Sequence, residues 1–434
     1  MVAADNPPLV DGSLSLDDIA AMQHVIGAFG ENIATPARGG WQNDIKTTSG
    51  WSSQKPAGVQ VIKGAARFTG PGTVDVGGRT LRYRQALIAT GAGPVSPRIP
   101  GLGQATVVTS ETIWDLPDLP ARLAVIGGGP VACELGQAFA RLGSAVTLII
   151  RSRMLPKEDP EAAGIVRESL QSDGVSIRAH ATVERITPAG GGSRVHLGDG
   201  SAVEADILLL AAGRGPRTAG LGLDRIGVRL DEHGQVVTDD RMRTTSPVIW
   251  AAGDVTQNPR FTHLAGVHAS VAATNAVLGL SRRVNATVPR VTYTSPELAA
   301  VGPSATGGTP NVLSRTVRHI HVDRAVTENN TAGFTRLTVD RRGRILGGTI
   351  VGPRAGESLA EVTLAVRKGL TTSDLAGTTH PYPTYSDGVW NAAIADVRER
   401  LGSPRTAAAM NILAFLRRQW LDRAPGQRSR RYPE

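Results

Sequence analysis

Residues 123–151, LAVIGGGPVACELGQAFARLGSAVTLIIR, have the pattern of a strand, a glycine turn, a helix and a second strand. The apolar run 123–126 has the length of a strand buried on both faces, and three glycines follow it directly. In such a unit Gly127 allows the sharp turn, Gly129 lets a pyrophosphate approach the backbone, and Ala132 keeps the helix close to the sheet. The stretch therefore predicts a dinucleotide-binding site.

The end of the second strand, 145–150, indicates which dinucleotide is bound. Sites for NAD usually carry an Asp or Glu about 20 residues after the glycines, where it accepts hydrogen bonds from the ribose. Here Ile150 occupies that place, and Arg151, Arg153 and Lys157 follow it. Cations at this place suit a 2′-phosphate, so we predict NADPH as the cofactor. The alternative is an ordinary solvated basic loop.

Composition limits the classes of protein to consider. A chain of 434 residues with 41% hydrophobic and 20% charged residues is ordinary for a globular protein of about three domains. The net charge of +9 would suit nucleic acid, but the cations are scattered and only 4% of residues are aromatic, so we expect no nucleic-acid partner. The densest basic run, 417–431, is interpreted as a solvated or poorly ordered tail.

Cysteine content and hydropathy exclude further classes. Cys133 is the single cysteine, so these residues cannot form an intramolecular disulfide, a redox-active cysteine pair or a thiolate zinc cluster, and we expect no metal site. Cys133 is interpreted as a buried small side chain. The sequence shows no signal-peptide pattern and no apolar window of about 18 residues, so we expect a cytoplasmic protein without a membrane partner.

Further strand and helix patterns surround the glycine motif. Three apolar strands end in small residues: 86–89 before Thr90 and Gly91, 206–212 before Gly213, and 248–252 before Gly253 and Asp254, a carboxylate that could bind a polyol. The other expected elements are helices at 16–32, 264–278 and 358–367, a loop at 35–56, antiparallel strands at 59–68 and 73–76, and strands at 335–339 and 345–351. These patterns predict an α/β protein with two related nucleotide-binding folds and a separate α+β domain.

Together these motifs carry a family resemblance. They are Ala89-Thr90-Gly91, Ile99-Pro100-Gly101-Leu102, the Gly127 motif, Ala212-Gly213-Arg214, Ala252-Gly253-Asp254 and, late in the chain, HPYPTYSD at 380–387. In this order they resemble the pyridine nucleotide-disulfide oxidoreductases, flavoproteins that include dihydrolipoamide dehydrogenase, glutathione reductase and mercuric reductase. The segment 151–160 resembles the mercuric reductase-like members most. The resemblance covers residues 59–410.

The resemblance implies a fold and an activity. It implies two Rossmann-like nucleotide-binding domains and a C-terminal α+β dimerisation domain, in a homodimer that moves hydride from the nicotinamide to FAD. The corresponding boundaries are 1–117 with 240–285 for an incomplete FAD-binding domain, 118–239 for the NAD(P)-binding domain, 286–412 for the dimerisation domain and 413–434 for a basic tail.

The resemblance also implies roles for particular residues. Asp254, after Gly253, would hold the ribityl chain of FAD, Leu264 and Ala265 would lie beside the flavin ring, and Thr90 and Gly91 would end a strand of the FAD domain. Gly213 is a further candidate cofactor-binding residue. The candidate catalytic residues are Glu134, which pairs with a lysine in relatives, and Tyr382 and Asp387 of the late motif.

The sequence also departs from the family pattern. It contains neither the redox cysteine pair nor the lysine that follows it, Tyr382 stands where disulfide-reducing relatives have a histidine, and no G-x-G-x-x-G precedes Val125. We therefore expect an incomplete FAD domain that purifies largely without flavin. Two functions stay open: an NADPH-dependent flavin oxidoreductase with a non-disulfide small-molecule acceptor such as a quinone, or a truncated or degenerate member that binds NADPH and dimerises without FAD or catalysis.

Overall fold

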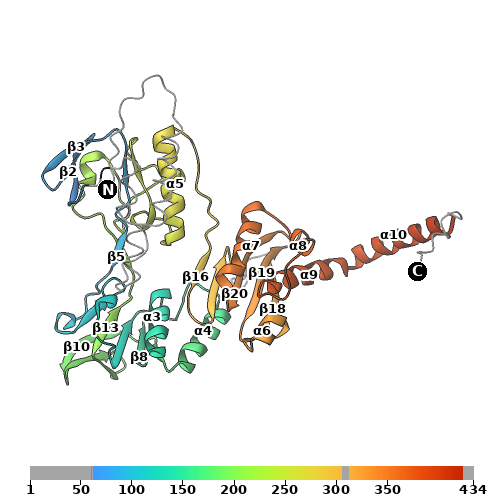
Figure 1. The fold of residues 1–434 in the computed structure, drawn as a ribbon, viewed down its shortest axis with the longest axis horizontal. Coiled ribbons are helices and arrows are strands. Elements are labelled where there is room, and N and C mark those ends of the chain that lie inside the picture. Colours follow the sequence, from blue (N-terminus) through green and yellow to red (C-terminus); the bar gives the residue numbers. More distant parts are fainter. Residues whose placement is uncertain (1–59, 61, 305–311, 424–434) are drawn as a thin grey trace. The chain divides into compact units, whose positions relative to one another are not determined.

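Residues 60, 62–304 and 312–423 are described by a computed structural model of the chain (Figure 1). They divide into two units, one within Met1–Pro156 and Arg167–Val288 and the other within Lys157–Val166 and Pro289–Glu434. The helix and loop expected at 16–32 and 35–56 lie outside the described residues. Among the described residues, no helix combines the length and apolarity that crossing a bilayer requires.

A five-stranded parallel sheet dominates one half of the first unit. Its strand order is β6 (Val107–Thr109), β13 (Ile207–Leu210), β7 (Arg122–Ile126), β8 (Ala145–Ile150) and β9 (Ser176–Ala179). The helix α3 (Pro130–Arg141) connects β7 to β8, and α4 (Pro160–Ser172) connects β8 to β9. The central strands are almost wholly buried, as expected for parallel strands covered on both faces. The strand, helix and strand predicted at 123–151 are confirmed as β7, α3 and β8.

Shorter strands make up the rest of the first unit. An antiparallel sheet of β10 (Val183–Ala189), β11 (Gly192–Leu197) and β12 (Ala202–Ala205) adjoins the parallel sheet. A second antiparallel sheet holds β1 (Ala66–Gly70), β2 (Thr73–Val76) and β3 (Arg79–Arg82). The remaining elements are β4 (Ala86–Ile88) parallel to β15 (Ile249–Ala251), β5 (Ala92–Pro94) antiparallel to β14 (Arg214–Pro216), the helix α5 (Thr262–Leu278), and 3-10 turns at Leu102–Gln104, Ile113–Asp115, Leu223–Ile226 (η4) and Gly253–Val255 (η5).

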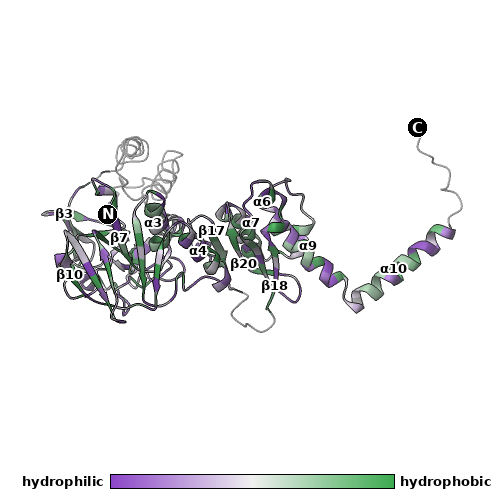
Figure 2. Cartoon of the chain, turned by 90° about the horizontal axis from the view of Figure 1, so that it is seen from below, coloured by the Kyte–Doolittle hydropathy of each residue, from purple (hydrophilic) through white to green (hydrophobic). Residues whose placement is uncertain are grey.

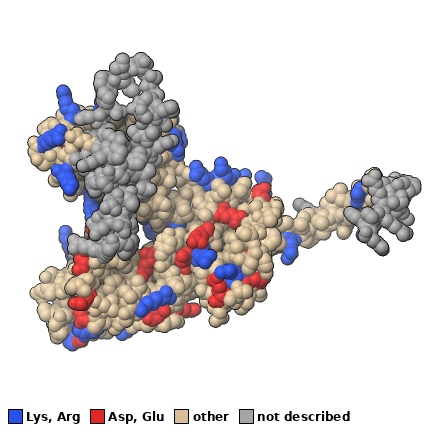
Figure 3. Space-filling model, viewed as in Figure 1, with Lys and Arg blue, Asp and Glu red and all other residues tan. Residues whose placement is uncertain are grey.

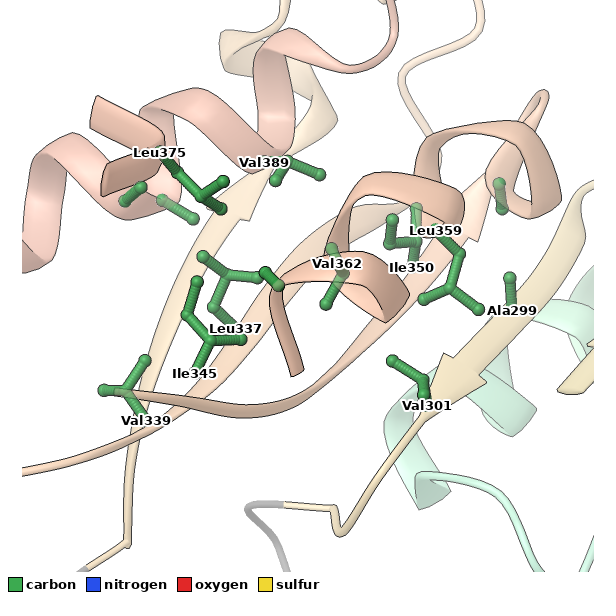
Figure 4. Close-up of a cluster of buried hydrophobic side chains, with 14 residues drawn as sticks. Ala299, Val301, Leu337, Val339, Ile345, Ile350, Leu359, Val362, Leu375 and Val389 are labelled. Carbon is green, nitrogen blue, oxygen red and sulfur yellow. The ribbon is translucent and has the colours of Figure 1, made fainter. Parts of the chain in front are cut away.

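The second unit is an antiparallel sheet covered by helices. Its strand order is β16 (Arg290–Thr292), β17 (Glu297–Val301), β20 (Ile345–Gly352), β19 (Phe334–Asp340) and β18 (Val312–Arg318). Side chains from β19 and β20 meet those of the helices in a shared apolar core, where Leu337, Val362 and Val389 are fully buried (Figure 4). The helices are α6 (Asp323–Thr327), α7 (Ala355–Lys368), α8 (Thr372–Ala376), α9 (Asp387–Leu401) and α10 (Pro404–Arg423), with a 3-10 turn at His319–His321.

These elements establish the expected α/β fold with a separate α+β domain. The strands expected at 335–339 and 345–351 are confirmed as β19 and β20, and the helix expected at 264–278 as α5. The basic run interpreted as a solvated or poorly ordered tail is helical up to Arg423, where α10 ends, and residues 417–422 are exposed. Alanine, leucine and arginine are strong helix formers, and their propensity outweighs the local repulsion between the arginines.

The segment Lys157–Val166 belongs to the second unit although it directly follows the loop after β8. Its Asp159 side chain is completely buried, and one carboxylate oxygen accepts a hydrogen bond from Arg336 Nη1 at 2.7 Å. The other oxygen accepts from the backbone N–H of Glu161 at 2.9 Å and thereby caps the start of α4. Arg336 also pairs with the Glu161 carboxylate. A buried charge needs this kind of compensation, so the ion pair determines where the segment lies.

We predict that Arg336→Ala destabilises the second unit by about 3 to 5 kcal/mol, because the substitution leaves the buried Asp159 carboxylate without its cation. The control is Arg318→Ala, which removes a half-exposed cation from the same Glu161 and should cost about 0 to 1 kcal/mol. Urea unfolding of both variants measures the difference, and equal losses would contradict the prediction.

The same contact gives a pH dependence. The Arg336 guanidinium is the main cause that lowers the pKa of Glu161 below its ordinary value. The resulting stabilisation is present above the unfolded pKa of the carboxyl and is lost as the pH falls through the lowered pKa. The difference in stability between the wild type and Arg336→Ala should therefore shrink in acid.

Candidate nucleotide-binding sites

The glycine turn after β7 is shaped by close backbone contacts. Gly127 has φ +148°, and a Cβ there would lie 2.3 Å from the Ala211 carbonyl oxygen. A Cβ on Gly128 would lie 2.5 Å from Ile150 Cγ2. A Cβ on Gly129 would meet nothing within 4 Å, so this third glycine borders open space. The first two glycines are therefore required by packing, whereas the third leaves room for a ligand.

The first turn of α3 begins at this open space. Gly129 is the N-cap residue with extended backbone, it has no side chain to cap the helix, and Pro130 follows as the first helical residue. N–H groups of the first turn of a helix have no partner inside the helix and favour an anion. Ala132 is fully buried, so the helix lies close to the sheet. Gly129 and the start of α3 thus fit the pyrophosphate of a dinucleotide.

The loop after β8 is held against the glycine turn. Leu155 N donates a hydrogen bond to Gly128 O at 2.7 Å, and the Leu155 side chain is buried. Arg151 is exposed, and within the described residues its side chain makes no ion pair or hydrogen bond. The Arg153 guanidinium donates to Pro156 O, so part of its donor capacity is used within the loop. Arg151 is therefore the cation best placed to reach a phosphate beside the turn.

Gly213 and Lys157, the remaining residues expected at the NADPH site, lie in different units. Gly213 follows β13, the neighbour of β7, so it shares an edge of the sheet with Gly127. It is exposed, has φ +131°, and a Cβ there would meet nothing within 4 Å. Lys157 is exposed but belongs to the second unit, so its expected contact with the nucleotide stays a prediction.

Asp254 has the properties expected of a group that binds a polyol. Its side chain is partly buried, and burial raises its pKa although Arg214 and Arg260 nearby lower it. Arg214 Nε lies 3.8 Å from one carboxylate oxygen, and within the described residues this carboxylate accepts no hydrogen bond. Its acceptor capacity is therefore available to hydroxyl groups such as those of a ribityl chain. The residue fits the role expected for binding FAD.

The start of α5 packs directly against the backbone of the Asp254 turn. Gly253 has φ +74°, and a Cβ there would lie 3.1 Å from the Cβ of Ala265. Leu264 and Ala265 are both buried at the start of α5. The structure thus brings Gly253, Asp254, Leu264 and Ala265 together, as the proposed FAD site requires.

A polar cluster holds the Thr90 turn. Thr90 Oγ1 donates to Arg217 O at 2.7 Å, and Arg217 N donates to Gly91 O at 2.9 Å. The Arg217 guanidinium in turn donates to the Glu111 carboxylate at 2.8 Å. Glu111 and Arg217 are not among the predicted site residues. They are 106 positions apart in the sequence, so no local pattern connects them.

The candidate catalytic residues are distributed over both units. Glu134 lies half-buried on α3 in the first unit, whereas Tyr382 and Asp387 lie in the second. Tyr382 is 69% exposed, and its hydroxyl donates to the Asp323 carboxylate, which raises the pKa of the phenol. Asp387 is buried and accepts from Thr384 N at 3.1 Å, so it stabilises the turn before α9. Their catalytic roles stay a prediction.

Two further facts limit the available chemistry. Cys133 is fully buried in α3, and burial raises the pKa of its thiol to about 12. The thiol is therefore protonated and inaccessible at neutral pH. Over residues 60, 62–304 and 312–423, no group of three or more His, Cys, Asp or Glu side chains is arranged to hold a metal ion.

Most of the chain matches a known protein family. Residues 19–269 match the family described as pyridine nucleotide-disulphide oxidoreductase, and residues 288–393 match its dimerisation domain. A mercuric reductase from Bacillus cereus is 39% identical over 76% of this chain, and a dihydrolipoyl dehydrogenase from Thermus scotoductus is 37% identical over 82%. This chain spans 54% of the length of the first relative and 80% of the second.

Solved structures show the same similarity. The flavoprotein disulfide reductase RclA from Escherichia coli aligns with a TM-score of 0.76 and 27% identity, covering 86% of this chain and 88% of that protein. LpdA from Mycobacterium tuberculosis aligns with a TM-score of 0.74 and 28% identity, covering 88% of this chain and 90% of that protein.

We predict that the wild type prefers NADPH over NADH and that Arg151→Ala removes much of this preference. A charge-assisted hydrogen bond to the 2′-phosphate contributes roughly 1.5 to 3 kcal/mol, so the variant should lose about ten- to a hundredfold in NADPH affinity and almost none for NADH. Calorimetric titration of both nucleotides measures this. Arg225→Ala, which removes an exposed cation from η4, is the matched control. Equal affinities of the wild type for the two nucleotides would overturn the prediction.

Proposed function

Since the chain belongs to the pyridine nucleotide-disulphide oxidoreductase family, we propose that it uses NADPH and FAD to reduce a small-molecule acceptor that is not a disulfide. Members of this family depend on FAD and NAD(P)H. The observation that carries the choice of acceptor is the single, buried cysteine. Thiol–disulfide exchange needs an attacking thiolate and a second thiol to resolve the mixed disulfide, and Cys133 cannot supply both.

The proposal assigns binding roles to the residues of the first unit. Gly129 and the first turn of α3 bind the pyrophosphate of NADPH, and Arg151, with Arg153, binds its 2′-phosphate. Asp254 accepts hydrogen bonds from the ribityl hydroxyls of FAD. Bound FAD would accept hydride from the nicotinamide and pass the electrons on. Glu134, partly shielded from water on α3, would orient groups near the flavin.

Tyr382 supports an acceptor that needs no strong base. A phenol whose pKa is raised stays protonated at neutral pH and does not take up a proton. Its single O–H donates to Asp323 in the structure, so Tyr382 would donate to an acceptor only after leaving that carboxylate. A quinone or another electrophilic carbonyl compound benefits from such a donor as negative charge develops on its oxygen. Asp387, which holds the turn after Thr384, would keep this segment in place.

We also propose that the chain forms a homodimer through the matched dimerisation domain, with the segment from Tyr382 to Asp387 reaching the flavin region of the partner subunit. This part of the proposal rests on the family alone.

A second candidate function is a family member that binds NADPH and dimerises without holding FAD. Two observations favour it. No G-x-G-x-x-G precedes Val125 in these residues, and within the described part of the chain β4 pairs with β15 alone. A helix start that receives the pyrophosphate of FAD is therefore not identified in this sequence.

We predict NADPH oxidation with a soluble quinone in the presence of FAD and none above background with oxidised glutathione or lipoamide. Because Cys133 takes no part, Cys133→Ala should change the quinone rate less than about twofold. The substitution removes only the buried sulfur atom from the side chain. A disulfide-reductase rate that Cys133→Ala abolishes would contradict the choice of acceptor. Absence of quinone reduction by flavin-loaded protein would contradict the activity.

Titration with FAD separates the two candidate functions. Among the described residues, no helix start is identified for the pyrophosphate of FAD. We expect two or three charge-assisted bonds to be missing, roughly 3 to 9 kcal/mol, and therefore predict an affinity of micromolar or weaker and little flavin after purification. Asp254→Ala should weaken binding by roughly tenfold or more, whereas Asp224→Ala on η4 should not. Nanomolar, stoichiometric FAD would show that the weak-binding prediction is wrong. Absence of binding, unchanged by Asp254→Ala, would support the second candidate.

A further inference from the structure

The helix α10 exposes a large apolar surface. Every side chain from Ala408 to Asp422 is exposed. Seven large apolar side chains of this helix are between 50% and 67% exposed, namely Met410, Ile412, Leu413, Phe415, Leu416, Trp420 and Leu421. Figures 1 and 2 show α10 extending away from the sheet and helices of the second unit. Apolar side chains gathered in this way on a single element indicate a surface that another body covers.

Most of the apolar residues are arranged on one side of the helix, whereas Phe415 and Leu421 lie beside Arg418 on the other side. Ala409, Leu413, Leu416 and Trp420 follow one another at spacings of four, three and four residues, which places them in one stripe. Ile412 and Met410 border this stripe on either side. Asn411, Arg418 and Asp422 repeat at spacings of seven and four on the opposite side. The part of the helix from Ala409 to Asp422 is thus amphipathic, with a wide apolar face and a narrow polar face that Phe415 interrupts.

Positive charge is concentrated in the same region. Residues 404–434 contain seven arginines and two acidic residues, a net charge of +5 in a chain whose net charge is +9. The arginines are Arg405, Arg417, Arg418, Arg423, Arg428, Arg430 and Arg431. The blue side chains on this arm in Figure 3 are arginines, because residues 404–434 contain no lysine. The partner of the apolar face must therefore also accept a high density of positive charge.

Charge distinguishes between the possible partners. Pairing α10 with the same helix of a second copy would cover the apolar face but would bring two +5 segments together, with Asp422 as the one acidic residue of each helix. An anionic bilayer meets both requirements, because the apolar face enters the acyl boundary while the arginines lie among the phosphates. The Arg417 guanidinium lies 4.3 Å from the centre of the Trp420 ring, and both side chains suit the headgroup region.

We propose that α10 binds in the headgroup region of an anionic lipid bilayer and holds the chain at the membrane surface. The expectation of no membrane partner rests on the absence of an apolar window long enough to span, and a helix that lies on the surface needs no such window. The proposal does not depend on the proposed activity. If both hold, the enzyme is placed where lipid-dissolved acceptors such as quinones are concentrated.

Flotation of the full-length protein with vesicles tests the proposal. At low salt, vesicles of phosphatidylcholine mixed with phosphatidylglycerol should bind the protein. Vesicles of phosphatidylcholine alone should bind at most roughly a tenth as much protein. High salt should weaken binding to the anionic vesicles, because it screens the arginines from the lipid phosphates.

Variants identify the surface that binds. Substituting Leu413, Leu416 and Trp420 together by Gln should abolish binding to either vesicle. Arg417→Gln with Arg418→Gln should reduce binding to the anionic vesicles by roughly tenfold. The matched control substitutes Leu142 and Ile320, two equally exposed apolar residues outside α10, by Gln and should bind like the wild type. Circular dichroism and NADPH affinity verify that each variant is folded.

Several outcomes would overturn the proposal. One is the absence of binding to anionic vesicles by the folded wild type, and another is undiminished binding by the triple Gln variant. A third is light scattering without lipid in which the triple Gln variant has a smaller mass than the wild type, since α10 would then pair with a second copy of this chain.

Discussion

The backbone of Gly127 lies so close to the Ala211 carbonyl that no side chain fits between them. The parallel pairing of β7 with β13 creates this contact and continues past it, where Ala211 N donates to Ile126 O at 2.9 Å. The contact fixes where the chain leaves the sheet and therefore where α3 begins. The loop that carries Arg151 is anchored to the next residue of the turn through Leu155 N and Gly128 O. The candidate nucleotide site thus depends on close backbone contacts, and at Gly127 only glycine permits the contact.

Patterns within a few residues of each other predicted this part of the fold well. The apolar run of β7, the glycine turn and the amphipathic pattern of α3 are each recognisable from neighbouring residues. Packing of α3 against the sheet favours the same structure as these local patterns. Contacts between distant polar residues carry no such signal. Arg217 and Glu111 are separated by 106 positions, and Arg336 and Asp159 by 177, so their pairing depends on a tertiary arrangement that periodicity does not encode. The sequence does not distinguish α10 from a solvated tail, because its clustered basic residues are typical of both.

Buried polar contacts in the second unit have a different role from its apolar core. Burial of residues such as Leu337 and Val362 lowers the free energy of folding without specifying a unique arrangement. The pairing of Asp159 with Arg336 adds little net stability once desolvation is counted, but any arrangement that separates the two leaves a buried charge. Specificity of placement therefore comes from the ion pair, and most of the driving force comes from the core.

Lys157–Val166 belongs to the second unit, whereas the residues on both sides of it belong to the first. A single cut in the sequence therefore cannot separate the two units. A piece that ends at Val288 would keep Asp159 and Glu161 without the arginines that neutralise them. A piece that starts at Pro289 would keep Arg336 without its acidic partners. Exchange of the C-terminal domain alone would place its arginine against an acidic segment from the other parent, whereas exchange together with the ten-residue segment keeps the pair from one parent. A recombination that keeps the second unit intact must therefore transfer both of its parts, Lys157–Val166 and the chain from Pro289 onward, which lie far apart in the sequence.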